Sequence, residues 1–401
     1  MTRLSKEELD KVKEKYNVPR IWSWSRVSTF MTSKYEYYLK YVKHVPENRQ
    51  DCGYAPLGSI AHDTLDSFYE GEIQYEDMTE QFNDGWITAI DIADLKLDRN
   101  DEEHDASIKA KYKEDLQHFF KNHVKYEQKL LIEKPVIAKV GSNVFVGYID
   151  ALFKDDDGNY NIVDFKTSSK YSGKTAGEKS GQLVLYGMGL IQAGVPADKV
   201  RICWNFLKYT TVEYQQKNGA VKTREIERCK IGESLQSNAR MWLKSAGYNE
   251  DDVDDYLKLL LDTNNVDVLP EEIRCKYKMI DCHVYVPLTQ KLMDKWIDTI
   301  ITTIRDIYAR EKDYEDTGSD KCFWDDEDNV KKESYYFSTL MAYSPSLHLP
   351  YKEYLDKLEA QKSGQDLFCG VGNDSENDVV TSQDICNNSN DEIDLSWLDE
   401  L

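Results

Sequence analysis

The chain has 401 residues, of which 40% are apolar and 12% aromatic, and this composition is typical of a globular protein with a full core rather than a disordered chain. The formal net charge of −22 argues against tight, non-specific binding to nucleic acid, although a local groove and bound metal ions can still hold phosphates. No apolar run approaches the length of a membrane span, no secretory signal is visible, and eight scattered cysteines favour a reducing, cytoplasmic location.

The predicted elements begin with a helical block after Ser23, followed by a helix over 57–70, short peripheral helices within 71–105 and a longer helix over 106–132. Alternating apolar residues then predict strands over 136–140, 144–153 and 160–167. A helix over 177–192, a strand over 200–209, another strand after residue 219, and helices within 231–262 and 289–314 follow. The order helix, β-hairpin, helix, strand predicts an α/β fold with a mixed central sheet flanked by helices, plus helical additions.

The most informative feature is a set of charged residues on the predicted hairpin. Asp150 lies on the first strand, and Asp164 and Lys166 lie on the second strand, two residues apart and therefore on one face. Ionised carboxylates on an apolar hairpin need water, a partner or a cation. Asp150, Asp164 and the backbone carbonyl of Phe165 offer the oxygen ligands that Mg²⁺ prefers. Together with Lys166 they predict a metal site that attacks phosphodiesters.

The connection between the strands decides whether Asp150 reaches that site. A two-residue turn at 157–158 would place Asp150 opposite Phe165, on the wrong face, whereas a three-residue connection over 157–159 would pair Asp150 with Lys166. The hypothesis therefore requires an odd-length connection or a bulge.

Four separated segments, in order, resemble the PD-(D/E)XK nucleases of the RecB/Cas4 type. The hairpin carries Gly147-Tyr148-Ile149-Asp150 and Ile162-Val163-Asp164-Phe165-Lys166, the segment from Gly58 to His62 resembles the family's G-x-x-x-H helix, and Gln182 to Tyr186 matches its Q-x-x-x-Y helix. The opening segment from Ser23 to Phe30, with Tyr37-Tyr38-Leu39, resembles its N-terminal helix.

The resemblance implies a restriction-endonuclease-like fold with its core at about 57–210, and a DNA nuclease, most simply an exonuclease in recombination, repair or phage DNA metabolism. It implies that His62 is a further metal ligand, which would also suit Mn²⁺, and that Gln182 and Tyr186 contact the DNA or the scissile phosphate. Glu178 on the same helix face would reach the water shell of the metal, and phosphates would lie near three lysines of the preceding loop and helix: Lys170, Lys174 and Lys179.

The chain departs from many relatives at the iron–sulfur cluster. Ser33 stands where the first cluster cysteine is expected, and Cys322 has no Cys-x-x-Cys partner pair after it. Because such a cluster needs a set of thiolates, we expect no iron–sulfur cluster. No Gly-x-x-x-x-Gly-Lys-Ser/Thr motif is present, so we expect no ATP hydrolysis.

The domain prediction is a nuclease domain over 1–360, a disordered acidic linker over 361–390, and an acidic tail over 391–401. The tail holds four apolar residues suited to a groove on a replication or recombination protein: Ile393, Leu395, Trp397 and Leu398. Docking of the tail on its own domain is the alternative. A non-catalytic DNA-binding or scaffold subunit recruited through this tail is the second functional hypothesis, and the intact Asp150, Asp164 and Lys166 argue against it.

Overall fold

The computed structural model describes residues 3–49, 51–171, 173–324, 340–343 and 349–365, and these divide into two compact units. Most of the predicted linker and the whole predicted tail lie outside the described residues, while 361–365 belong to a helix, α14. No helix in the described ranges combines the length and the apolarity that crossing a membrane requires.

The first unit contains the N-terminal residues, part of the hairpin, and the C-terminal helices. Its helices and strands are α1 (Lys6–Tyr16), β1 (Ile21–Trp22), α2 (Trp24–Thr32), α3 (Lys34–Tyr37), the π-helix η1 (Tyr38–Val42), most of α12 (Gln290–Thr317), η7 (Asp320–Phe323) and α14 (Tyr351–Gln365). Tyr35 packs edge-on against Trp324 and Tyr354, so aromatic side chains bring the first helices and the C-terminal helices of this unit together.

The second unit carries the predicted nuclease core and one additional lobe. Its helices are α4 (Tyr54–Tyr69), α5 (Met78–Trp86), the π-helix η3 (Ile87–Ile92), α6 (Glu102–Asn122), α7 (Lys174–Lys179), α8 (Gly181–Gln192), α9 (Ile231–Ala246), α10 (Glu250–Thr263) and α11 (Glu271–Arg274), with short 3₁₀ turns η2 (Tyr75–Asp77), η4 (Ala197–Lys199), η5 (Arg228–Lys230) and η6 (Val266–Val268). Its strands are β2 (Leu131–Val140), β3 (Asn143–Lys154), β4 (Tyr160–Lys166), β5 (Val200–Gln215), β6 (Val221–Glu227) and β7 (Tyr277–Val286), of which β2 and β3 extend into the first unit.

Within the described residues the strands form one seven-stranded mixed sheet, which confirms the predicted fold class. The strands β1, β3, β4, β5 and β6 are successive neighbours, β2 pairs with β3, and β7 pairs with β5. The pairs β1–β3 and β4–β5 are parallel, and β3–β4, β5–β6 and β5–β7 are antiparallel. The parallel pair β4–β5 needs a crossover, and α7 and α8 supply it.

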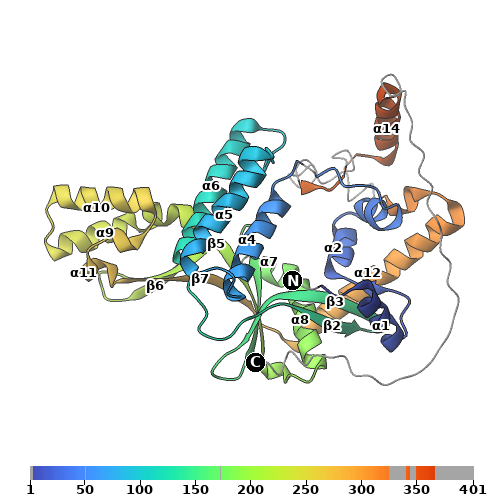
Figure 1. The fold of residues 1–401 in the computed structure, drawn as a ribbon, viewed down its shortest axis with the longest axis horizontal. Coiled ribbons are helices and arrows are strands. Elements are labelled where there is room, and N and C mark those ends of the chain that lie inside the picture. Colours follow the sequence, from blue (N-terminus) through green and yellow to red (C-terminus); the bar gives the residue numbers. More distant parts are fainter. Residues whose placement is uncertain (1–2, 50, 172, 325–339, 344–348, 366–401) are drawn as a thin grey trace. The chain divides into compact units, whose positions relative to one another are not determined.

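The main core lies between the sheet and three helices, α4, α5 and α6, which stand side by side (Figure 1). Their apolar faces pack on Phe153, Val163, Phe165 and Leu207 of the sheet. Since Phe165 is fully buried on this side, its neighbours Asp164 and Lys166 are directed to the opposite side of β4.

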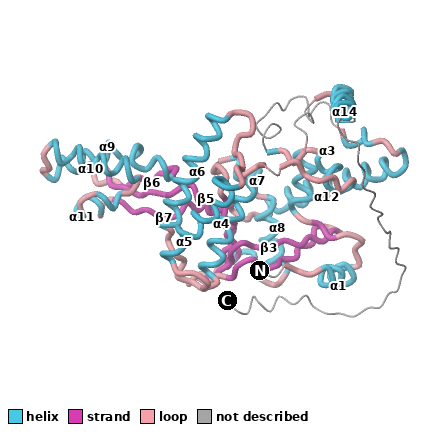
Figure 2. The backbone as a smooth tube through the Cα atoms, turned by 45° about the horizontal axis from the view of Figure 1, so that its top comes forward, coloured by secondary structure: helices cyan, strands magenta, loops and turns pink. Residues whose placement is uncertain are grey.

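The second half of β5 continues beyond the core and runs with β6 and β7 toward α9, α10 and α11 (Figure 2). This lobe has its own apolar core, in which Val212 and Tyr214 pack against the helices. The sequence predicted helices within 231–262, and the structure divides them into α9 and α10 at Gly247, whose φ of 92° ends α9 in the left-handed conformation.

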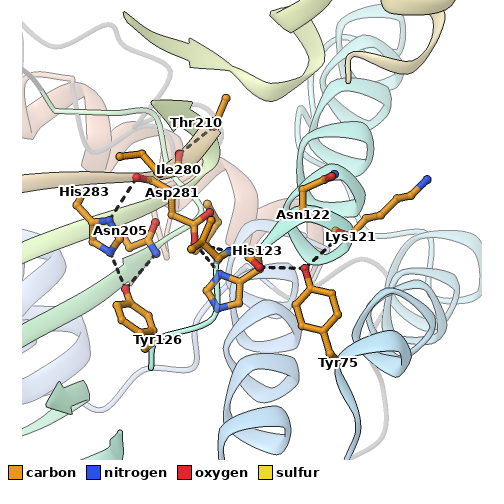
Figure 3. Close-up of polar contacts among 12 residues, drawn as sticks. Tyr75, Lys121, Asn122, His123, Tyr126, Asn205, Thr210, Ile280, Asp281 and His283 are labelled. Atoms are coloured by element: carbon orange, nitrogen blue, oxygen red, sulfur yellow. Dashed lines mark hydrogen bonds and ion pairs between the residues drawn. The ribbon is translucent and has the colours of Figure 1, made fainter. Parts of the chain in front are cut away.

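A buried polar network joins the root of this lobe to the end of α6 (Figure 3). Asp281 on β7 lies 2.6 Å from Nδ1 of His123 and 2.7 Å from Nη2 of Arg228. Burial opposes ionisation of Asp281, but the hydrogen bond and charge of His123 and the charge of Arg228 lower its pKa. The buried carboxylate is therefore compensated.

Several boundaries in this unit differ from the sequence-based prediction; the strand predicted over 200–209, for example, continues to Gln215. The helix predicted over 106–132 ends at Asn122, and residues 131 and 132 already belong to β2. The strand β7 was not predicted at all.

Candidate active site

The connection between β3 and β4 has the odd length that the site requires. Lys154 pairs with Tyr160, so five residues, 155–159, join the strands, and extension of the register past Ala151 and Val163 sets Asp150 opposite Asp164. The predicted three-residue connection, with Asp150 opposite Lys166, is wrong. The parity is nevertheless the required one, because five is also an odd number and places Asp150 on the face of Asp164. Within this longer loop, Oδ1 of Asp155 accepts a hydrogen bond from the Asn159 N–H at 2.8 Å.

Asp164 is the most deeply buried carboxylate of the hairpin, with 1% of its surface exposed. Neither carboxylate oxygen accepts a hydrogen bond of ordinary geometry, but Nζ of Lys166 forms an ion pair with Oδ2 at 2.5 Å. Burial works against the charge on Lys166, yet the charges of Asp164 and Asp150 raise its pKa, so Lys166 stays a cation at neutral pH.

Asp150 and His62 meet at the backbone of Phe165. Oδ2 of Asp150 accepts from the Phe165 N–H at 2.9 Å, and Nε2 of His62 donates to the Phe165 carbonyl at 3.1 Å. Burial, and next the charge of Asp164, raise the pKa of Asp150 well above its ordinary value. Burial also lowers the pKa of His62, which favours the neutral imidazole that a metal ligand requires.

Glu133 is a fourth candidate that the sequence analysis missed. One ligand atom from each of His62, Glu133 and Asp150 lies within 4.8 Å of the others. Glu133 has a left-handed backbone with φ of 49°, which is strained for this residue and persists only where the surroundings enforce it. The available signal was an isolated acid between Ile132 and the apolar residues that follow Pro135. Because residues up to 132 were predicted to be helical and the next strand was predicted to begin at 136, Glu133 was not recognised as part of β2.

Asp66 adds a further acid one helical turn after His62 on α4. It is 3% exposed, and its Oδ2 has no hydrogen-bond partner. Burial, followed by the charges of Glu133 and Asp150, raises the pKa of Asp66 to about 8. Asp66, Glu133 and Asp150 thus lie close enough for their negative charges to oppose one another's ionisation.

Gln182 and Tyr186 lie on α8 at i and i+4, and Nε2 of Gln182 donates to the Tyr186 hydroxyl at 2.9 Å. Tyr186 packs against Gly147 of β3, where a Cβ would lie 2.4 Å from the ring. Burial and the negative charges of Asp164 and Asp150 raise the pKa of the Tyr186 phenol, which keeps it a hydrogen-bond donor at neutral pH.

Three of the other charged residues that the sequence analysis named form ion pairs outside the hairpin. Lys170 pairs with Glu225 of β6, and Lys174 lies 3.4 Å from Glu178 in an exposed ion pair on α7. Glu178 is not part of the group formed by His62, Glu133 and Asp150.

The donor set fits a divalent cation. It combines buried carboxylate oxygens that lack ordinary hydrogen bonds, Oδ1 of Asp164 and Oδ2 of Asp66, with an imidazole and a backbone carbonyl. Such hard oxygen ligands with one nitrogen suit Mg²⁺ or Mn²⁺ chemistry. A bound cation would also offset the repulsion that raises the pKa values of Asp66 and Asp150.

Comparison with known proteins agrees with this geometry. The family model described as the PD-(D/E)XK nuclease superfamily matches residues 21–324, a range that contains the hairpin, α4 and α8. No curated protein gives a significant match. The narrower likeness to RecB/Cas4-type nucleases rests on the sequence motifs and stays a prediction. Nucleases of this superfamily generally depend on divalent metal ions. Since the match covers most of the chain, the protein belongs to the PD-(D/E)XK nuclease superfamily.

Proposed function

We propose that this protein is a divalent-metal-dependent DNA nuclease, an exonuclease that acts in recombination, repair or phage DNA metabolism in the cytoplasm of a bacterial or phage-infected cell. The observation that carries the proposal is the convergence of Asp150, Asp164, Lys166 and His62 at one end of β4. We assign Asp150, Asp164, His62 and the Phe165 carbonyl as metal ligands, with Mg²⁺ or Mn²⁺ as the cofactor.

The metal ligands, Lys166 and the α8 residues would have different roles in cleavage. When bound, the metal ion acidifies water and neutralises charge that develops on the scissile phosphate. Lys166 remains protonated and can hold the attacking water or a non-bridging phosphate oxygen, since its ion pair with Asp164 fixes the ammonium at the site. The Gln182 amide and the Tyr186 hydroxyl, which are hydrogen-bonded to each other, would donate hydrogen bonds to the DNA strand.

The alternative is a DNA-binding or scaffold subunit without catalysis, recruited to a replication or recombination protein through Ile393, Leu395, Trp397 and Leu398. The buried acids of the site, whose carboxylate oxygens lack ordinary hydrogen bonds, disfavour this alternative. Asp164 and Asp66 are costly to bury, and a scaffold would gain nothing from them. The tail itself remains a proposed docking segment for a partner protein.

The test uses purified protein with end-labelled linear and circular DNA, single- and double-stranded, in Mg²⁺, Mn²⁺ or EDTA. Asp164→Ala and Lys166→Ala should each lower the rate at least a hundredfold, because each removes a charge that acts on the transition state. The matched control is Asp156→Ala, which removes an exposed acid of the β3–β4 loop and should leave the rate unchanged.

Activity in EDTA, or full activity of both active-site variants, would contradict the mechanism. Cleavage of linear but not circular DNA would identify an exonuclease. An inactive wild-type protein that still binds DNA would favour the scaffold alternative.

A further inference from the structure

A second cluster of candidate metal ligands lies at the root of the additional lobe. One ligand atom from each of Asp115, Glu227 and Cys229 lies within 4.8 Å of the others. Asp115 belongs to α6 of the main core, whereas Glu227 ends β6 and Cys229 lies in η5, immediately before α9. The cluster therefore connects a core helix to the lobe, and none of its residues has a part in the proposed nuclease chemistry.

Asp115 is the most deeply buried member of this cluster, with 1% of its surface exposed. Its Oδ1 accepts a hydrogen bond from the Cys229 N–H at 2.8 Å, so the carboxyl group faces η5. Its Oδ2 is buried and has no hydrogen-bond partner within the described residues. Because a buried carboxylate oxygen without a partner is costly, this atom indicates a place for a cation.

Cys229 supplies a sulfur atom beside this carboxyl group. Its side chain is half-buried, and burial, followed by the charges of Asp115 and Glu227, raises the pKa of its thiol to about 12. A thiol with so high a pKa is a poor nucleophile, so the surroundings do not suit a reactive cysteine. They do suit a metal ligand, because a bound metal ion displaces the thiol proton and is attracted by both acids.

Two lysines near the cluster offset part of its negative charge. Lys230 forms an ion pair with Oε2 of Glu227, which leaves Oε1 of that residue for a cation. Burial raises the pKa of Asp115 to about 7, although the nearby charge of Lys208 acts in the opposite direction. Lys208 makes no hydrogen bond to Oδ2 of Asp115. The buried oxygen therefore stays open to a metal ion even with both lysines in place.

The kinds of ligand atom in the cluster favour a particular class of metal. One thiolate with two carboxylates combines soft and hard ligands, a set that prefers Zn²⁺ or Co²⁺ to Mg²⁺. Ligand atoms lie about 2.0–2.3 Å from the metal in tetrahedral zinc sites. Ligand atoms that already lie within 4.8 Å of one another need only small side-chain movements to share one ion. Three protein ligands leave the fourth position to water.

We propose that Asp115, Glu227 and Cys229 bind one Zn²⁺ ion, which ties α6 to the root of the lobe. Binding forms a bond between the metal and the sulfur of Cys229 and releases the thiol proton to solvent. The site differs in chemistry from the candidate active site, whose predicted ligands include no sulfur atom. Because the ion binds the folded chain, it should also raise the melting temperature.

The experiment titrates the full-length protein with Co²⁺ and follows the thiolate-to-metal charge-transfer band in the near ultraviolet, which ligands without sulfur cannot give. The wild type should show the band, and Zn²⁺ should abolish it by displacing Co²⁺, whereas an excess of Mg²⁺ should not. Cys229→Ser should lose the band. Asp115→Asn should bind Co²⁺ about tenfold more weakly, because the amide keeps an acceptor for the Cys229 N–H but removes the negative charge.

The matched control is Cys275→Ser, which removes an exposed thiol of the same lobe and should leave the band unchanged. Circular dichroism checks that each variant is folded, and the comparison of Asp115→Asn with the wild type decides the question even if Cys229→Ser does not fold.

Three outcomes would overturn the proposal. The first is a wild type without the charge-transfer band, and the second is a band that persists in folded Cys229→Ser. The third is unchanged Co²⁺ affinity in both Asp115→Asn and Glu227→Gln, which would mean that the thiol binds the metal without the two acids.

Discussion

The buried acids of the site make a prediction about stability that does not depend on activity. Replacement of Asp66 by Asn removes a carboxyl group that is 3% exposed and lies near Glu133 and Asp150. The amide has almost the same shape and can donate to these acids. We therefore expect Asp66→Asn to stabilise the metal-free protein.

The magnitude follows from the pKa of Asp66, which burial and then the neighbouring acids raise from an ordinary 3.8 to about 8. A group with a raised carboxyl pKa favours the folded state only when protonated, so its stability cost is absent below pH 4, grows up to pH 8 and is constant above it. At 1.36 kcal/mol per unit, the gain from Asp66→Asn should increase by roughly 3 kcal/mol between pH 5.5 and pH 8.5.

The assay is urea denaturation in EDTA at these two pH values, both above the sequence pI of about 4.8. Asp63→Asn, an exposed acid on the same helix, is the control and should change stability by less than about 0.5 kcal/mol at either pH. A gain that is equal at both pH values, or a loss of stability at pH 8.5, would refute the electrostatic reasoning.

Three further changes test other contacts. Gly147→Ala places a Cβ 2.4 Å from the Tyr186 ring, so we expect a loss of about 1–3 kcal/mol in urea denaturation together with a fall in the cleavage rate. Arg228→Met removes one of the two partners of the buried Asp281 and should cost about 3–5 kcal/mol, measured in the same way; a cost below 1 kcal/mol would mean that His123 alone compensates the carboxylate. Glu133→Gln should weaken Mn²⁺ binding about tenfold, seen as a smaller increase in melting temperature on adding Mn²⁺, and an unchanged increase would exclude Glu133 as a ligand.

Local patterns predicted the parts of the site that depend on short-range geometry. Side chains two residues apart on a strand lie on the same face, and this spacing places Asp164 and Lys166 together. Residues four apart on a helix lie side by side, and Gln182 and Tyr186 do form the hydrogen bond that this spacing allows. The parity argument for Asp150 also held, although the loop is five residues long rather than three.

The missed parts depend on contacts that no local pattern encodes. β7 pairs with β5 from more than 60 residues away and changes register between Asn205 and Thr210, so its partner cannot be deduced from its own residues. Glu133 comes to the site through a left-handed residue early in β2, and nothing in its sequence neighbours demands that conformation. The position of Glu133 at the site therefore depends on tertiary packing rather than on local sequence.

The backbone of Phe165 explains how the site keeps its shape before a metal ion binds. Its N–H donates to Asp150 and its carbonyl accepts from Nε2 of His62, so two of the predicted ligands, His62 and the carbonyl, satisfy each other. For Nε2 to bind a cation, the ring proton must move to Nδ1, which lies 3.7 Å from Oδ2 of Asp150 and can bond there after a small shift. Burial lowers the pKa of His62, so the ring changes tautomer without losing a charge. Metal binding at Nε2 would therefore exchange one internal hydrogen bond for another, while the Phe165 N–H on β4 would keep its bond to Asp150.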